Sequence, residues 1–160
     1  MKKVTIDENV GKILYGPASS EGKKVLEQLF GKKVLAGDAI ERVNSIAAAY
    51  EETGRPLVTH PSELPIDLHA FFLKLYDFIV VAEGMNDGEK LSYEDLKQEK
   101  WYPWLKLLPA GGVGYYGTFY FTTTATAGDA ARLRFISERA AKAFGTNPEF
   151  QKLALDLMNL

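Results

Sequence analysis

The sequence predicts an α+β fold, with N-terminal helices, a small antiparallel β-sheet in the second half and C-terminal helices that pack on it. Three observations lead to this prediction. Apolar residues recur at helical spacing through the first half. Between residues 113 and 121 they alternate with smaller or polar ones, as in a half-buried strand. The aromatic residues concentrate between residues 101 and 144. A chain of 160 residues fits one domain, which we place at residues 1–160.

Composition and charge exclude several classes of function. The chain has no cysteine, which excludes disulfides, thiolate nucleophiles and thiolate metal sites. Its formal net charge of -2 gives no general electrostatic attraction to nucleic acid or to an anionic membrane. No apolar signal core follows Met1, and the apolar runs at residues 46–50 and 78–82 are too short to span a bilayer. We therefore expect a cytoplasmic protein that does not engage a membrane.

The first two helices are predicted from their caps. Asp7 is a good N-cap for a short first helix that ends near residue 16. Ser19 or Ser20 then caps a second helix whose apolar residues follow helical spacing. Gly31 is the expected C′ stop of that helix.

Two longer helices are predicted next. Asp38 and Glu41 have the spacing of a capping box, and the apolar stripe that follows predicts a third helix up to Gly54. A fourth helix, over residues 66–83, has the broadest apolar face, so we expect it at the centre of the core. Gly84 is the expected stop.

The sheet is predicted as a hairpin of residues 113–121 and 131–135, joined by turn residues 127–129. The odd positions of the first strand are predicted to face inward. A third strand is expected at residues 105–108. Beyond the sheet, Ser137 is placed to cap one helix, and Asn147 with Pro148 predicts a last one.

Met85, Asn86, Asp87 and Gly88 follow a long predicted helix. They are followed by Lys100, Tyr102, Pro103 and Trp104, and Arg132, Leu133, Phe135 and Ser137 precede an Ala-containing helix. With these residues the sequence from Met85 onward resembles a family of small uncharacterised proteins from phages, prophages and mobile elements of gut bacteria. The resemblance lies in a polar segment after a long helix, a Lys-x-Tyr-Pro-Trp-type segment, a Gly/aromatic region and an Arg-Leu-x-Phe-x-Ser strand before an Ala-containing helix. Glu89 and Arg134 stand where the family has Trp and Cys. The resemblance implies a shared origin and fold, and no catalytic residues. It is carried by Met85, Asn86, Asp87, Gly88, Lys100, Tyr102, Pro103, Trp104, Gly112, Gly114, Tyr115, Arg132, Leu133, Phe135, Ser137, Ala140 and Phe144.

One candidate binding surface is the even face of the predicted hairpin. Tyr116 and Tyr120 on one strand, with Arg132 and Arg134 on the other, would point the same way. Single-stranded nucleic acid is held by this combination, because bases stack on rings and guanidinium groups contact phosphates. The alternative is a set of cross-strand pairs on a solvated or helix-covered face. The acidic net charge and the absence of a wider basic cluster favour that alternative.

A second candidate is the aromatic segment at residues 101–104. If Trp101 and Trp104 are exposed, they form an anchor for a protein partner, since Trp is enriched at binding hot spots. The alternative is a loop that folds onto the core, with Pro103 fixing a turn.

The remaining candidates are weaker. The glycine-rich residues 110–114 lack the following helix that a phosphate-binding loop needs. His60 and His69, with Glu63 and Asp67, form a chemically acceptable metal set, but no spacing places them on one face. We predict no cofactor, no metal and no catalytic residue.

The sequence thus predicts a non-enzymatic accessory protein, derived from a phage or mobile element, that binds a protein partner or itself. The alternative is a single-stranded nucleic-acid-binding protein that uses the aromatic and arginine face. A third reading, an enzyme using His60 and His69, has no motif behind it. An exposed apolar patch near Trp101 and Trp104 would favour the first reading, and a continuous positive face the second.

Overall fold

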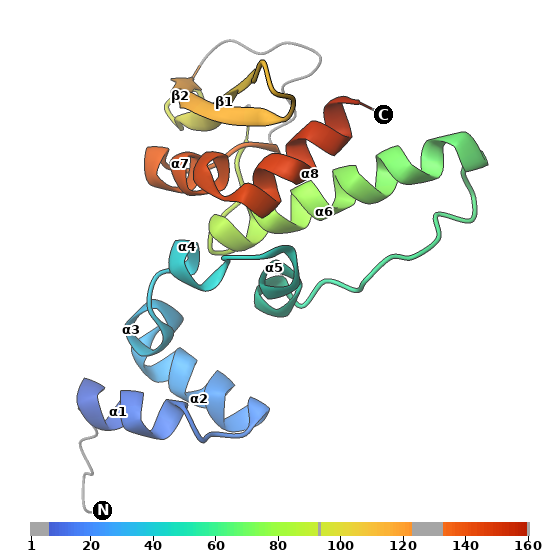
Figure 1. Ribbon diagram of the computed structural model, residues 1–160. Coiled ribbons are helices and arrows are strands. Elements are labelled where there is room, and N and C mark those ends of the chain that lie inside the picture. Colours follow the sequence, from blue (N-terminus) through green and yellow to red (C-terminus); the bar gives the residue numbers. More distant parts are fainter. Residues whose placement is uncertain (1–6, 93, 123–132, 160) are drawn as a thin grey trace, which may run out of the picture.

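The fold is described from a computed structural model, which describes residues 7–92, 94–122 and 133–159 (Figure 1). The predicted α+β class is confirmed, since helices precede and follow a two-stranded antiparallel sheet in the second half of the chain. No helix in these ranges is long and apolar enough to cross a membrane. The elements are α1 (Glu8–Tyr15), α2 (Ser20–Phe30), α3 (Lys32–Ala36), α4 (Ala39–Arg42), α5 (Ile46–Thr53), η1 (Ile66–Leu68), α6 (His69–Met85), β1 (Lys100–Leu107), β2 (Val113–Phe121), α7 (Glu138–Thr146) and α8 (Pro148–Met158).

Most of the predicted caps are confirmed. The side-chain oxygens of Asp7, Ser19, Ser137 and Asn147 each accept a hydrogen bond from a backbone N–H two or three residues further on. Gly31 ends α2 with φ of 81°, in the region that favours glycine. These elements begin and end where the sequence places them because a cap is a contact between near neighbours.

The predicted single helix from Asp38 to Gly54 is wrong, because the chain forms α4 and α5 instead. The backbone of Ser45 is extended, with φ of -149°, and its hydroxyl accepts a hydrogen bond from the backbone N–H of Ala48 in α5. Asn44 and Ser45 both favour such local side-chain bonds, which compete with helix continuation. The capping box is also absent. The Glu41 carboxylate, which a capping box would direct to the backbone N–H of Asp38, accepts a 2.8 Å hydrogen bond from Arg139. The short helix α3 has no counterpart in the prediction.

The predicted central position holds for the C-terminal half of α6, whereas Phe72 in its N-terminal half is 37% exposed. Val80 and Val81, in the C-terminal half, are fully buried. The predicted stop at Gly84 is wrong, because the helix continues to Met85. Gly84 instead permits close packing, since a Cβ at this position would lie 3.1 Å from Cγ2 of Val43.

The predicted pairing is wrong for the described residues: β2 pairs with β1, and residues 133–135 do not pair with β2. The predicted turn at 127–129 and the start of the predicted partner strand at 131–132 lie outside the described residues. The expected strand at 105–108 largely forms the end of β1. Residues 133–135, the described part of the predicted partner strand, form one β-bridge with β1. In this bridge Phe135 and Trp101 exchange two backbone hydrogen bonds of 2.9 Å. Pro103 suggested a loop, yet it fits an edge strand, where its missing N–H faces away from the partner.

An aromatic cluster joins the hairpin to the helices beneath it. Phe144 of α7 is fully buried, with ring centroids 4.7 Å from Phe78, 5.3 Å from Phe135 and 5.3 Å from Phe150. These side chains come from α6, α7, α8 and the segment before α7. The cluster therefore fixes the platform on which the hairpin lies (Figure 1).

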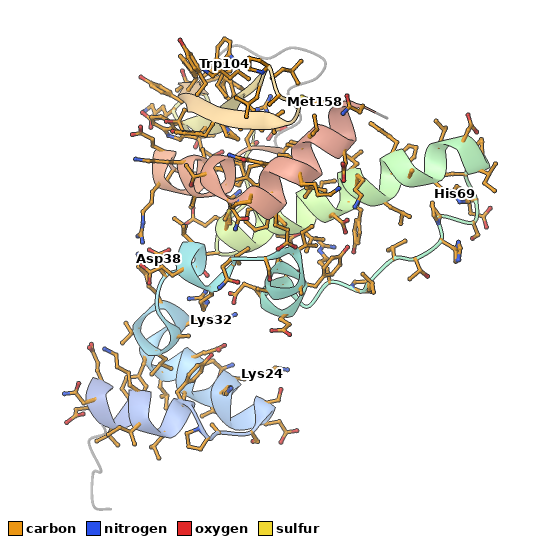
Figure 2. All side chains as sticks on the ribbon, in the orientation of Figure 1. Lys24, Lys32, Asp38, His69, Trp104 and Met158 are labelled. Atoms are coloured by element: carbon orange, nitrogen blue, oxygen red, sulfur yellow. The ribbon has the colours of Figure 1, made fainter. Side chains whose placement is uncertain are left out.

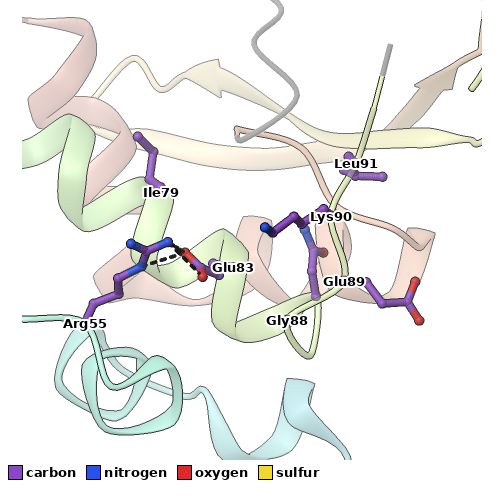
Figure 3. A pocket seen from close by; sticks show the side chains of 8 residues that line it. Arg55, Ile79, Glu83, Gly88, Glu89, Lys90 and Leu91 are labelled. Atoms are coloured by element: carbon purple, nitrogen blue, oxygen red, sulfur yellow. Dashed lines mark hydrogen bonds and ion pairs between the residues drawn. The ribbon is translucent and has the colours of Figure 1, made fainter. Parts of the chain in front are cut away.

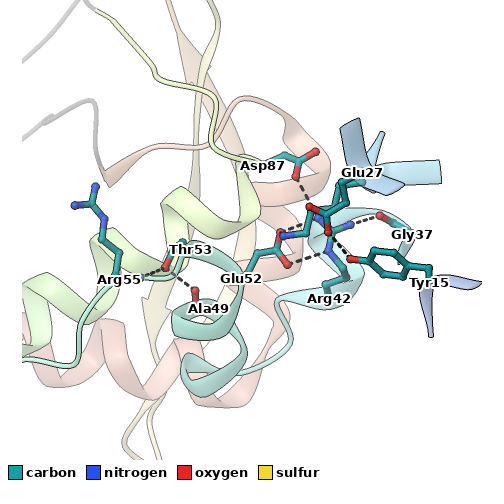
Figure 4. Close-up of polar contacts among 10 residues, drawn as sticks. Tyr15, Glu27, Gly37, Arg42, Ala49, Glu52, Thr53, Arg55 and Asp87 are labelled. Atoms are coloured by element: carbon teal, nitrogen blue, oxygen red, sulfur yellow. Dashed lines mark hydrogen bonds and ion pairs between the residues drawn. The ribbon is translucent and has the colours of Figure 1, made fainter. Parts of the chain in front are cut away.

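Helices α1, α2 and α3 project away from this body (Figure 1), and a polar cluster lies where they join it (Figure 4). Arg42 donates to both carboxylate oxygens of Glu52, at 3.0 and 2.8 Å, and to Asp87 at 3.1 Å. Nζ of Lys32, in α3, lies 2.6 Å from Oε1 of Glu52 and forms an ion pair with it. We call Lys32, Arg42, Glu52 and Asp87 the polar joint.

Glu52 should make the polar joint sensitive to acid. Burial alone would raise the pKa of Glu52, but hydrogen bonds and charges from Arg42 and Lys32 outweigh it and lower the pKa. The carboxylate therefore stabilises the fold above its unfolded-state pKa, and this stability is lost as the pH falls through the lower folded-state pKa. We expect Glu52→Gln to lower the free energy of unfolding by about 1.5–3 kcal/mol near neutral pH.

Urea denaturation near neutral pH and at about pH 3 checks this expectation. The difference between wild type and Glu52→Gln should shrink as the pH falls through the lowered pKa of Glu52. Glu51→Gln, at the exposed neighbouring position, is the matched control and should match wild type at both values. An equal deficit for Glu52→Gln at the two pH values would contradict the expectation.

Candidate binding surface

A β-bulge in β2 decides which side chains share a face of the hairpin. Trp104 lies opposite Gly117, whereas Leu105 lies opposite Tyr115, so Tyr116 is an extra residue. An extra residue inverts the alternation of faces beyond it. The predicted inward orientation of the odd positions therefore holds at Tyr115 and is wrong at Phe119.

Contacts on the two sides of the bulge confirm the inversion. A Cβ on Gly145 of α7 would lie 2.6 Å from the Tyr115 ring, so Tyr115 faces the helices. Thr118 also faces α7, where its hydroxyl bonds to Glu138 at 3.0 Å. Phe119, the next residue, instead packs its ring 4.7 Å from that of Trp104.

The face away from α7 carries five aromatic side chains, which we call the outer aromatic face. Adjacent ring centroids lie between 4.7 and 6.5 Å apart. Figure 2 shows Trp104 on this side of the sheet. The exposed fractions are 48% for Trp104, 63% for Tyr116 and 40% for Phe119, which is high for large rings. The face consists of Tyr102, Trp104, Tyr116, Phe119 and Phe121.

Lys106 and Arg134 lie over rings of this face. Nζ of Lys106 is 5.3 Å from the ring centroid of Tyr116. The guanidinium carbon of Arg134 is 5.0 Å from the ring centroid of Tyr102 and 5.8 Å from that of Phe121. Such distances are those of cation–π contacts. The outer aromatic face therefore combines apolar area with positive charge.

The structure divides the predicted site residues between two faces. Trp104 and Tyr116 belong to the outer aromatic face, and Arg134 lies over its Tyr102 and Phe121 rings. Trp101 and Tyr120 pack against each other at 4.7 Å on the opposite face, where Trp101 also contacts the core. The prediction that Tyr116 and Tyr120 share one face is therefore wrong, and the bulge is the reason. Arg132 lies outside the described residues.

Sequence reasoning missed Tyr102, Lys106, Phe119 and Phe121 as members of this surface. The predicted alternation of inward and outward side chains runs unbroken past Tyr116. It therefore assigns Phe119 and Phe121 to the core face. One signal pointed to the bulge: Gly117, inside the strand, is a residue type that often marks one.

The histidines do not form a centre in the described part of the chain. Nε2 of His69 lies 2.8 Å from the carbonyl oxygen of Leu64, and His60 is an exposed loop residue. Nowhere in the described ranges do three His, Asp or Glu side chains come together to hold a metal ion.

A pocket of about 220 Å³ lies beside the end of α6 (Figure 3). Its lining includes Arg55 and Glu83, which bond to each other at 2.8–3.0 Å. Lys90 and Glu89 add one further charge of each sign. Because Arg55 and Glu83 pair with each other and the lining has no net charge, the pocket provides no strong electrostatic preference for an ionic ligand.

Comparison of the chain with protein-family models, curated proteins and solved structures finds no match. The resemblance to proteins of phages and mobile elements therefore stays a prediction, and a functional proposal has to rest on the geometry.

Proposed function

We propose that this protein is a non-enzymatic accessory protein that binds a protein partner through the outer aromatic face. The observation that carries the proposal is the exposure of Trp104, Tyr116 and Phe119 beside one another on one face of the sheet. Aromatic side chains in a cluster supply much apolar area on binding, and Trp, Tyr and Arg are enriched among residues that dominate binding energy.

The cations indicate what kind of partner fits. Lys106 and Arg134 flank the rings, so the complementary surface has an apolar centre and carboxylates at its rim. A second copy of this chain fits less well, because its own outer aromatic face would bring the same cations together. The resemblance of residues from Met85 onward supports the proposal of a partner from the biology of a phage or mobile element.

Single-stranded nucleic acid is the second candidate ligand, and the cation–ring geometry favours it. Bases stack on aromatic faces while Lys and Arg contact phosphates. Against it, the described residues show only Lys106 and Arg134 over these rings, which is a small positive area, and the net charge of the chain is -2.

Trp104→Ala with Tyr116→Ala should weaken partner binding at least about 100-fold, since each hot-spot residue contributes about 2 kcal/mol or more. Affinity capture from the host, followed by titration of the captured partner, measures the change. Tyr120→Ala is the matched control, because Tyr120 is 53% exposed on the opposite face. Equal binding by the double variant and wild type would refute the proposal.

A titration of fluorescent oligo-dT and oligo-U at two salt concentrations tests the second candidate. Salt-sensitive binding that Lys106→Ala with Arg134→Ala abolishes would replace the protein partner by nucleic acid. Sedimentation of the free protein shows whether it self-associates through the same face.

A further inference from the structure

Within the described residues, the edge of β1 that faces away from β2 is paired at Trp101 alone, where it bridges to Phe135. In an antiparallel ladder, alternate residues direct their backbone polar groups to the same edge. Trp101 bonds to Phe135 at the edge away from β2, so Pro103, Leu105 and Leu107 direct their groups to that edge too. Among the described residues, no hydrogen bond reaches their backbone groups there. The edge therefore offers alternating carbonyl and N–H groups beyond Trp101.

An apolar groove of about 420 Å³ borders this edge. Phe78 and Phe144 line it from the aromatic cluster, and Leu157 and Met158 line it from the last turn of α8. Its volume lies in the range of sites that hold ligands. Arg134 is the charged residue among the described side chains that line the groove, and it lies over the ring of Tyr102.

We propose that this groove binds an extended peptide that ends in an apolar residue with a free carboxylate. The peptide adds to β1 as a strand, continuing the position that Phe135 occupies for one residue. Its backbone bonds to Leu105 and Leu107, and alternate side chains enter the groove. The terminal carboxylate contacts the guanidinium group of Arg134, which suits a planar anion.

The edge argues for a peptide rather than a small apolar acid. A fatty acid would fill the groove and contact Arg134, but it has no donors and acceptors for the strand edge. A peptide main chain presents both at the spacing of the strand. The groove lies along the edge of β1, whereas the outer aromatic face is the face of the sheet that points away from α7. Tyr102 and Trp104 border both sites.

Fluorescence anisotropy with two pools of labelled pentapeptides tests the proposal. Both pools have randomised leading positions and end in Leu, Val or Phe, one with a free carboxylate and the other amidated. We expect the acid pool to bind at least about 10-fold more tightly, as a charged hydrogen bond contributes about 1.5–3 kcal/mol and about 1.4 kcal/mol is a factor of ten. No binding of either pool, or equal binding of both, would overturn the proposal.

Two substitutions separate the edge from the groove. Leu107→Pro removes one edge N–H from a residue whose side chain is 73% exposed, and it should weaken binding about 3–10-fold. Leu107→Ala keeps the N–H and should bind like wild type. Met158→Glu, at a position 60% exposed, places a negative charge beside the groove and should weaken the acid pool more than the amidated pool.

Further controls keep the outcomes distinct. Tyr116→Ala changes the outer aromatic face alone and should leave peptide binding unchanged. The peptide-binding proposal can therefore be refuted without refuting the proposed binding of a protein partner, and the reverse also holds. Decanoate that binds where the peptides do not, equally to wild type and Leu107→Pro, would show a small-molecule site and overturn the peptide proposal. Urea denaturation of each variant verifies that it is folded.

Discussion

Replacing Phe144 by alanine should lower the free energy of unfolding by about 3–5 kcal/mol, the usual range for a buried phenylalanine. The side chain is fully buried and contacts rings from three other segments, at centroid distances of 4.7 to 5.3 Å. These partners are held by α6, α8 and the bridge to β1, so they cannot collapse freely into the cavity. The loss is a large part of a typical domain stability of about 5–15 kcal/mol.

Urea denaturation followed by circular dichroism measures this loss. Phe72→Ala is the matched control, because Phe72 lies on α6 with 37% of its surface exposed. It should cost about 1 kcal/mol or less, since little apolar area leaves the core. Similar losses for Phe144→Ala and Phe72→Ala would contradict the assignment of the aromatic cluster as the centre of the fold.

Replacing Gly145 by alanine should destabilise the protein by about 1–3 kcal/mol, the cost of overpacking. A Cβ at this position would lie 2.6 Å from Cδ2 of Tyr115 and 2.9 Å from Cβ of Pro103. The glycine lies inside α7, where alanine is intrinsically better by about 1 kcal/mol. The steric cost should exceed this gain, because Tyr115 and Pro103 belong to paired strands and cannot move independently.

The control for this expectation is Gly16→Ala. Gly16 has a right-handed helical conformation, with φ of -53°, and a Cβ there meets no atom within 4 Å. The substitution should therefore be neutral or slightly stabilising. Thermal unfolding of both variants tests the sign. A stabilised Gly145→Ala variant would show that the hairpin does not lie on α7 as closely as described.

Part of the candidate site was predictable and part was not. Trp104, Tyr116 and Arg134 stood out because aromatic and arginine residues cluster in the sequence. Tyr102, Phe119 and Phe121 did not, because assigning a face requires the register of both strands. The register contains a bulge that the alternation of a single strand does not show.

The helix caps show what the sequence determined by itself. Asp7, Ser19, Ser137 and Asn147 each bond to a backbone N–H at most three residues away, so the signal and its partner lie in the same short segment. The α+β class followed in the same way from the change of apolar period, which is also local.

The tertiary structure alone decided the pairing of β1 with β2, the packing at Gly145 and the groove beside β1. Trp101 pairs with Phe135, and Gly145 packs against Tyr115, although the residues of each pair are more than 25 positions apart in the sequence. The free energy of such contacts depends on which segments come together, and therefore on the loop closures and packing of the whole domain. One extra residue in β2 was enough to exchange the faces of the sheet, and with them the surface that a partner meets.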